Sequence, residues 1–181
     1  EQDGFGEPLL KNEVVNSIAI DGGNRKWMGT NNGVFLISED GTEQLFHFTT
    51  ENSPLLSNSV LEVAINQESG EVFFGTDKGI ISYRGESTGG KPNHDNALIF
   101  PNPVRADYSG PIAISGLVED AVIKITDVSG ILIYETQALG GQAIWDGNNV
   151  NGRRAQTGVY LVFSSNEDGS EKFVGKLLVV N

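Results

Sequence analysis

The sequence predicts an all-β protein, and two observations support this prediction. Glycine occurs 23 times and proline six times among 181 residues, which indicates many turns. No segment has the long apolar periodicity of an amphipathic helix, whereas short apolar segments bounded by Gly, Asn, Asp or Ser recur along the chain. The rhythm of these segments changes after a polar, glycine-rich stretch near residue 85, so we expect two domains.

The first domain contains an internal repeat. Residues 27–34 read Trp-Met-Gly-Thr-Asn-Asn-Gly-Val, and residues 73–80, which begin 46 residues later, read Phe-Phe-Gly-Thr-Asp-Lys-Gly-Ile. An aromatic strand, a Gly-Thr-x-x-Gly turn and a second apolar strand predict a β-hairpin, in which the last glycine supplies a positive φ. A hairpin repeat of about 40–50 residues is typical of β-propeller blades. The repeat motif consists of Trp27, Gly29, Thr30, Gly33, Phe73, Gly75, Thr76 and Gly79.

Residues 1–84 are expected to form two such blades. The expected strands are 14–20, 26–30, 33–37 and 43–48 in the first blade, and 60–65, 71–74 and 79–83 in the second. Propellers usually need at least four blades, and a strand from the start of the domain commonly completes the last one. We therefore interpret residues 1–84 as the C-terminal fragment of a larger propeller, incomplete by itself, whose open blade edge offers a route to self-association.

Residues 85–96 are interpreted as a linker, because they contain three glycines and a proline but no aliphatic side chain. Seven strands are expected in the second domain, residues 97–181: 97–100, 111–115, 121–126, 131–136, 142–145, 159–164 and 173–180. Apolar and polar residues alternate in the third of them, which implies one buried face. Seven short strands in about 85 residues predict an immunoglobulin-like β-sandwich, with Trp145 as its large core aromatic.

The charge and composition exclude several classes of function. The net charge is −12, from 12 basic and 24 acidic residues, which argues against binding to nucleic acid and against electrostatic attachment to an anionic bilayer. The chain has no cysteine, so disulfides and thiolate metal sites are excluded. No apolar run has the length of a membrane span, and residues 1–4 are interpreted as the start of a mature fragment or an interior cut rather than a signal peptide.

The sequence gives little support for catalysis. His47 alternates with phenylalanines in an expected strand and His94 lies in the expected linker, so we assign structural or solvent-exposed roles to both. A serine in nucleophile-elbow context and a phosphate-binding loop are both absent from the sequence. We therefore predict that the protein is not an enzyme.

One loop combines two weak candidates for binding. Residues Asp146–Gly152 offer several oxygen ligands for Ca²⁺, but the closing glutamate of an EF-hand is missing, so a hydrogen-bonded Asx turn is favoured and no cofactor is expected. Arg153 and Arg154 follow directly and are candidates for contacting an anionic glycan or a protein partner, with a solvated loop as the default interpretation.

The aromatic residues of the blades allow two interpretations. Trp27, Phe73 and Phe74 have the chemistry to stack on a sugar, but we expect them to be buried between neighbouring sheets, and we expect the same of the aromatics at positions 46, 48 and 83. Ligands of propellers usually bind at the loops of one face, which here are residues 21–24, 31–32, 67–70 and 77–78.

The first domain resembles the two-component-regulator propeller repeat. That family shows an apolar strand, an Asp or Gly turn, then Trp-x-Gly-Thr-x-x-Gly, and here Ile18-Ala19-Ile20-Asp21 precedes Trp27–Gly33. The second copy has Phe73 in place of the tryptophan. The resemblance implies an extracellular propeller of the kind found in sensor kinases of Bacteroidetes and also outside kinases.

The second domain is similar to the C-terminal sorting domain of the Por (type IX) secretion system. The family motifs are a Tyr/Phe-Pro-Asn-Pro opening, an Asp-x-x-Gly hairpin, a Gly-x-Tyr strand and a final Lys-aliphatic strand. The residues that match them here are Phe100, Pro101, Asn102, Pro103, Asp127, Gly130, Gly158, Tyr160 and Lys176. A propeller followed directly by such a domain resembles the cell-surface components of the type IX machinery.

The two resemblances imply a non-enzymatic, exported protein of the periplasm or outer-membrane surface. The expected partners are proteins at the outer membrane, or an anionic glycan or lipopolysaccharide. Two alternatives are a glycan-binding sensor module, and secreted cargo whose sorting domain is removed after export. The chain ends at Asn181 directly after an expected strand, which we interpret as a true C-terminus that favours the machinery component or cargo over a sensor kinase.

Overall fold

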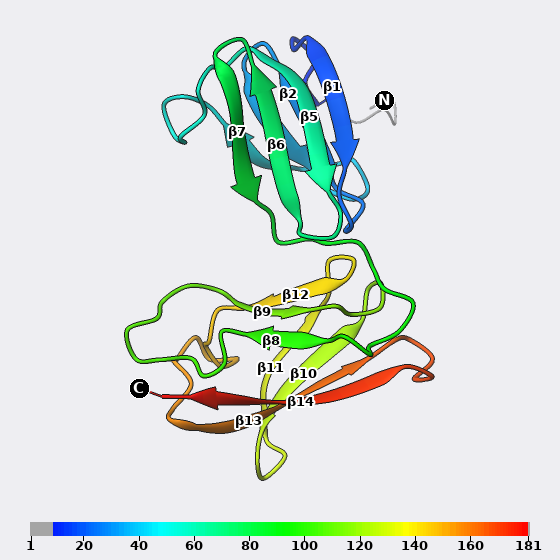
Figure 1. Ribbon diagram of the computed structural model, residues 1–181, viewed down its shortest axis with the longest axis vertical. Helices are drawn as coiled ribbons and strands as arrows, with labels where there is room; N and C mark the ends of the chain where they lie inside the picture. The colour runs from blue at the N-terminus through cyan, green and yellow to red at the C-terminus, as the bar shows by residue number, and fades with distance from the viewer. Residues whose placement is uncertain (1–8, 181) are drawn as a thin grey trace, which may run out of the picture. The chain divides into compact units, whose positions relative to one another are not determined.

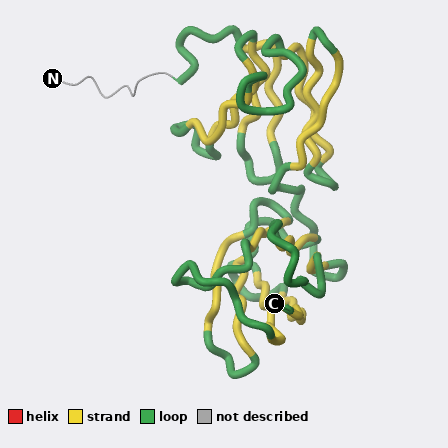
Figure 2. Tube along the Cα trace, turned by 90° about the vertical axis from the view of Figure 1, so that its left-hand side faces the viewer, coloured by secondary structure: helices red, strands yellow, loops and turns green. Residues whose placement is uncertain are grey.

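The computed structural model describes residues 9–180. Within this range all regular secondary structure consists of β-strands. Figure 2 shows strands separated by loops throughout. The chain divides into two compact units, the first ending at Asn66 but including Glu71–Gly85, and the second comprising Gln67–Gly70 and the residues from Glu86 onward. The prediction of an all-β fold is confirmed. In the range that the structure describes, no helix has the length and hydropathy that a membrane crossing requires.

The first unit contains two antiparallel sheets (Figure 1). Strands β1 to β4 form a four-stranded sheet in chain order, which we call the first blade, and strands β5 to β7 form a three-stranded sheet, the second blade. All seven expected strands are present, with ends within two residues of the prediction. Their bounds are β1 (Val15–Ile20), β2 (Lys26–Thr30), β3 (Gly33–Ile37), β4 (Gln44–Phe48), β5 (Val60–Asn66), β6 (Glu71–Thr76) and β7 (Gly79–Arg84).

The repeated Gly-Thr-x-x-Gly sequence forms the same turn in both blades. The Thr30 hydroxyl donates to the carbonyl oxygen of Gly33 (3.0 Å) and accepts from the backbone N–H of Asn32 (3.0 Å). Thr76 makes the equivalent bonds, with Gly79 at 2.8 Å and with the N–H of Lys78 at 3.1 Å. Both glycines, which directly follow the two loop residues, have a positive φ, +113° and +125°, a conformation that glycine adopts without the steric cost of a Cβ. The Thr and the last Gly of the repeat therefore build the hairpin turn.

A buried carboxylate explains the tryptophan of the first copy. Asp21 accepts hydrogen bonds from the backbone N–H groups of Gly23 and Arg25 (3.0 Å each), from Arg25 Nε (2.9 Å) and from Trp27 Nε1 (3.1 Å). These bonds hold the indole in the core between the blades, where its ring lies 5.8 Å from that of Phe74. A buried indole N–H needs such an acceptor, whereas a phenyl ring does not.

Three of the aromatic burial predictions are wrong, among them that for Tyr83, which is 36% exposed although its ring lies 5.7 Å from that of Trp27. Phe73 is 37% exposed, because its register with Ala64 and Ser82 places it on the face of the second blade that points away from the first. Phe46, on the end strand of the first blade, is 51% exposed. Trp27 and Phe74 are buried as expected, because they lie on the two faces that pack together.

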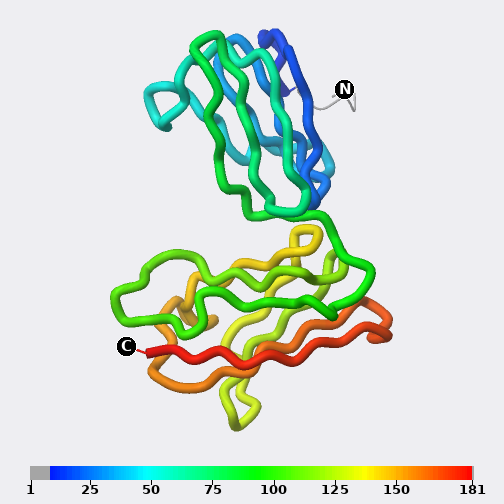
Figure 3. Tube along the Cα trace, viewed as in Figure 1, coloured from blue at the N-terminus to red at the C-terminus, as the bar shows by residue number. Residues whose placement is uncertain are grey.

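The second unit is a β-sandwich of two sheets, in the orders β11-β10-β13-β14 and β12-β9-β8. All seven expected strands are present, which confirms the immunoglobulin-like prediction, and Trp145 is fully buried in the core between the sheets. Figure 3 shows the last two strands side by side. The bounds are β8 (Leu98–Phe100), β9 (Ile112–Ser115), β10 (Val122–Asp127), β11 (Leu132–Gln137), β12 (Gln142–Trp145), β13 (Gly158–Ser165) and β14 (Lys172–Val179).

The segment interpreted as a linker, residues 85–96, is a packed part of the second unit from Glu86 onward. Thr88 forms a parallel bridge with Gly140, and Lys91 forms one with Val118. His94 is only 5% exposed. The segment is therefore held by main-chain pairing along the sandwich, although its polar composition suggested an open spacer.

Candidate functional site

The Phe-Pro-Asn-Pro motif closes the edge of the last strand. The side-chain amide of Asn102 donates from Nδ2 to the carbonyl oxygen of Lys176 (2.8 Å) and accepts at Oδ1 from the N–H of Leu178 (3.1 Å). Two residues further, Val104 donates its N–H to Leu178 O and accepts from Val180 N, both at 2.8 Å. Prolines have no N–H with which to pair. The asparagine side chain therefore replaces a main-chain pair, and an otherwise exposed sheet edge is covered.

The Asp-x-x-Gly motif forms the hairpin between β10 and β11. Oδ1 of Asp127 accepts from the N–H of Ser129 (2.8 Å), from the Ser129 hydroxyl (2.6 Å) and from the N–H of Ile131 (3.0 Å). These donors lower the pKa of Asp127, led by the bond from the Ser129 hydroxyl. Gly130 supplies the left-handed residue, with φ +88°. The aspartate is thus engaged in holding a turn.

The Gly-x-Tyr motif lies in the core of the sandwich. The ring of Tyr160 is nearly buried and meets Trp145 edge-on, with centroids 6.0 Å apart. Its hydroxyl donates to the carbonyl oxygen of Gln156 (2.8 Å), and burial raises the pKa of Tyr160. Gly158, which opens this strand, has free space where a Cβ would point.

Lys176 differs from the other residues of the sorting-domain motif. Its side chain is exposed, and only its carbonyl oxygen takes part in the bonds that hold the edge. Phe100, at the start of the motif, is exposed as well. Side chains of the motif that are available to another molecule are therefore few, and they lie beside the closed edge of the last strand.

The loop after Trp145 is held by its own hydrogen bonds. Asp146 accepts from Asn148 N and Nδ2 (2.8 Å each), and Asn149 Oδ1 accepts from the N–H groups of Asn151 (3.0 Å) and Arg153 (3.1 Å). These are Asx turns, the arrangement favoured by the sequence. Among residues 9–180, no group of three or more His, Cys, Asp or Glu side chains is placed to hold a metal ion.

The two candidate arginines are placed differently. Arg154 donates from Nη1 to the carbonyl oxygen of Asp146 (2.9 Å) and from Nη2 to that of Tyr108 (3.0 Å). Its guanidinium therefore already pins two loop segments to each other. Arg153 has an exposed side chain.

The histidines have packing partners rather than a catalytic arrangement. His47 stacks on Phe35 at 3.9 Å, and its Nε2 lies 2.8 Å from the carbonyl oxygen of Asn32. His94 lies 3.4 Å from both Val118 N and the buried Ser164 hydroxyl, and burial lowers the pKa of His94. Within residues 9–180, no carboxylate hydrogen-bonds to either imidazole, so no nucleophile–base–acid relay is formed.

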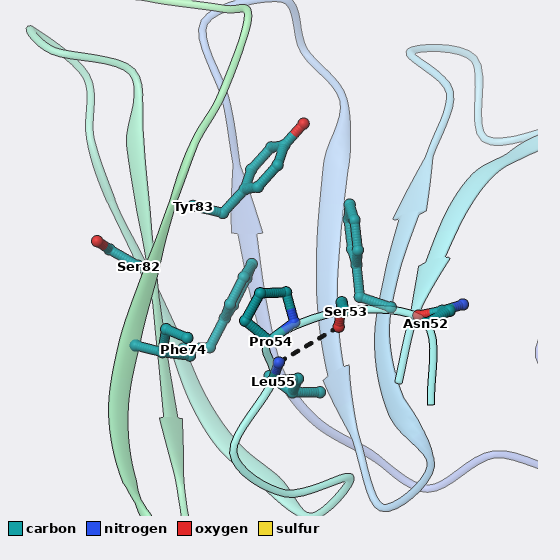
Figure 4. A pocket seen from close by; sticks show the side chains of 9 residues that line it. Asn52, Ser53, Pro54, Leu55, Phe74, Ser82 and Tyr83 are labelled. Carbon is teal, nitrogen blue, oxygen red and sulfur yellow. Dashed lines mark hydrogen bonds between the residues drawn. The ribbon is translucent and has the colours of Figure 1, made fainter. Parts of the chain in front are cut away.

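Sequence reasoning missed a cavity in the first unit. It has a volume of about 240 Å³ and is open to solvent between the end of the first blade and strand β7 of the second (Figure 4). Apolar and aromatic side chains dominate its wall. The lining residues are Phe48, Asn52, Ser53, Pro54, Leu55, Phe74, Ile81, Ser82 and Tyr83. The missing fourth strand of the second blade was the signal in the sequence that pointed to this place.

Comparison with known proteins identifies the second unit. Residues 98–180 match the family described as the secretion system C-terminal sorting domain, which confirms the resemblance seen in the sequence motifs. No curated protein sequence matches the chain. The presence of a sorting domain indicates an exported protein.

Among solved structures, the whole chain is similar to PorZ of Porphyromonas gingivalis, a surface component essential to the type IX secretion system. The identity is 31% and the TM-score 0.66, over 100% of this chain but only 24% of PorZ. Dimeric latent PorU of the same organism matches with 19% identity and a TM-score of 0.38, over 61% of this chain and 12% of that one. The extracellular domain of a one-component system of B. thetaiotaomicron matches with 13% identity and a TM-score of 0.34, over 97% and 26%.

Proposed function

We propose that this chain is a non-enzymatic part of a type IX secretion component at the cell surface. The observation that carries the proposal is the similarity to PorZ along the whole chain at 31% identity, together with the sorting-domain match at residues 98–180. In this function the sandwich serves sorting or docking, and the blades serve binding to a partner. The blades are a C-terminal fragment of a larger propeller, in keeping with a chain that spans about a quarter of PorZ.

Proteins are better candidates for the partner than an anionic glycan. The sandwich exposes several large apolar side chains, among them Leu98, Phe100, Val174 and Leu178, and such groups gather at protein interfaces. The net charge of −12 repels a polyanion. Arg154, one of the two arginines that suggested anion binding, uses its guanidinium for two main-chain carbonyls.

Retention of the sorting domain is favoured over its removal. A processing protease needs an extended, accessible segment, and the natural place is the junction between the two domains. Here Ser87 and Thr88 are buried, and Gly89 and Lys91 donate their N–H groups to main-chain carbonyls. Cleavage at 87–91 would require local unfolding of this segment. This argues against the hypothesis that the chain is secreted cargo whose sorting domain is removed.

The test is the intact mass of the protein in cell fractions of its native host. We expect a surface-bound species that keeps residues 97–181, and loss of type IX cargo from the surface when the gene is deleted. A released protein shortened by about the mass of the sandwich would refute the proposal and identify cargo. As a control, the deletion strain is complemented with the Asn102→Ala variant, in which the edge of β14 is weakened. This variant shows how a sorting domain that is present but destabilised behaves in the same assay.

A further inference from the structure

The outer face of the four-stranded sheet of the sandwich carries exposed apolar and basic side chains. In β13 and β14, the core residues are Tyr160, Val162, Leu177 and Val179, so the residues that alternate with them point away from the core. With the exception of one serine, these outward residues are apolar or basic. They are Val159, Leu161, Phe163, Ser165, Lys172, Val174, Lys176 and Leu178.

Part of this outer face, which we call the lysine face, has an apolar centre between basic side chains. It is defined by Lys124, Phe163, Lys172, Val174 and Lys176. Phe163 lies directly opposite Lys124 on β10 and opposite Val174 on β14. Lys172 and Lys176 stand two residues to either side of Val174 and therefore share its face of the strand. Both apolar residues of the centre are exposed, Phe163 by 38% and Val174 by 61%.

A hollow of about 200 Å³ opens on the lysine face. Lys124 and Lys172 line it from the two strands that flank β13, and Phe163 and Val174 add apolar surface. The hollow thus offers room for an apolar side chain of a bound molecule, with ammonium groups close by for its charged neighbours.

The charge of the lysine face is opposite to that of the chain. The chain has 24 acidic and 12 basic residues, whereas three lysines meet on this face. Lys124 has a partner on the same sheet, since its Nζ lies 3.4 Å from Oε1 of Glu135. Among residues 9–180, neither Lys172 nor Lys176 forms a salt bridge. These two lysines are therefore free to pair with carboxylates of another molecule.

The acidic residues of the β13–β14 loop have other contacts. Asp168 accepts a hydrogen bond from the N–H of Ser170 (2.9 Å) within its own turn. Glu171 acts on the buried His94, since burial lowers the pKa of His94 and this carboxylate partly opposes the shift. His94 lies 3.4 Å from the hydroxyl of Ser164, which is buried on the core side of the sheet. The loop therefore leaves the lysine face positively charged.

A segment of another protein fits this face better than a membrane or a second copy does. An apolar centre with polar groups around it is the usual arrangement of a protein–protein contact. Patches that recognise anionic lipids usually carry about four to eight basic residues, and here there are three in a chain of net charge −12. A two-fold dimer through this face would bring lysines against lysines.

We infer that the lysine face binds an acidic segment of another protein, whose carboxylates pair with Lys172 and Lys176 and whose apolar side chain enters the hollow beside Phe163. This inference deepens the docking role proposed for the sandwich, and it rests on that role only for the existence of a partner. The negative charge of the chain as a whole then favours this orientation, because the rest of its surface repels an acidic partner.

The test uses a photo-cross-linking residue, p-benzoylphenylalanine, in the complete gene product in its native host. It takes the place of Val174 or, as the control, of Leu98, which is 67% exposed on the other sheet. We expect a cross-link from position 174, absent from position 98, to a peptide of another protein in which Asp and Glu outnumber Lys and Arg. No cross-link from position 174, or one to a lipid, to lipopolysaccharide or to a second copy, would overturn the inference.

Charge reversal shows whether the lysines hold the segment. With the cross-linker at position 174, Lys176→Glu should lower the yield of the cross-link about tenfold or more, because it sets like charges against each other. Lys78→Glu makes the same change of charge in the exposed turn between β6 and β7 and is the matched control. Calorimetry should show an unchanged unfolding temperature for both variants, since both side chains are exposed. Equal cross-link yields in the two variants would contradict the assigned role.

This result is distinguishable from that of the secretion test. If the gene is deleted and type IX cargo stays at the surface, the proposed function fails, while a cross-link to an acidic segment still supports the binding face. If cargo is lost from the surface and position 174 gives no cross-link, the inference about the lysine face fails alone.

Discussion

Replacement of Asn102 by alanine should weaken the sandwich without affecting the blades. The side chain makes two hydrogen bonds to the main chain of β14, at 2.8 and 3.1 Å. At about 0.5–1.5 kcal/mol net for each bond, their loss should cost about 1–3 kcal/mol, and nearer the lower end because the site is partly solvated. In a domain of about this size, 1 kcal/mol lowers Tm by roughly 4–8 °C.

The two tryptophans make the assay specific to each unit. Trp27 lies in the core of the blades and Trp145 in the core of the sandwich, so 5-fluorotryptophan labelling gives one ¹⁹F signal from each. During thermal unfolding we expect the Trp145 transition to shift and the Trp27 transition to stay. Asn102→Asp keeps the acceptor and loses the amide donor, so it should fall between wild type and Asn102→Ala. A Trp145 transition unchanged in Asn102→Ala would refute the assigned role.

Three further predictions use the same two signals. Asp21→Ala removes the carboxylate that accepts hydrogen bonds from four donors, and it should destabilise the blades by about 3 kcal/mol or more. The Trp27 transition should then occur at a lower temperature. Gly29→Ala would place a Cβ 2.9 Å from Val60 and should cost about 1–3 kcal/mol, whereas Gly75→Ala meets its nearest neighbour only at 3.5 Å and should be nearly neutral in this chain. The pKa of His94 in the folded protein lies below its unfolded value, so the sandwich is most stable above about pH 6.5 and loses stability as the pH falls below it. The Trp145 transition should therefore move to lower temperature between pH 7 and 5. In His94→Gln this pH dependence should be weaker.

The strands were predictable because local signals agree along the whole chain. Apolar alternation gave their faces, and glycines such as Gly33 and Gly130 marked turns whose backbone requires a positive φ. The exposure of Phe73 was not predictable from its own segment. Burial of a blade aromatic depends on whether another sheet covers its face, which is a tertiary property that the repeat alone does not contain.

The packed segment before β8 shows a second limit of sequence reasoning. Residues 86–96 have the composition of a spacer, but their main chain pairs with residues far along the sequence, such as Thr88 with Gly140. Long-range main-chain pairing leaves little trace in composition, because any residue with an N–H and a C=O can take part.

The side chains of the sorting-domain motifs mainly stabilise the fold, so other residues must provide recognition of a partner. Asn102 holds β14, Asp127 holds a hairpin, and Tyr160 fills the core, so each has a structural reason to be the residue that it is. A partner that docks on this sandwich must instead contact exposed side chains, of which Phe100 and Lys176 lie beside the closed edge. Recognition can therefore differ between proteins that share the motifs, because Asn102, Asp127 and Tyr160 are engaged in bonds and packing within the domain itself.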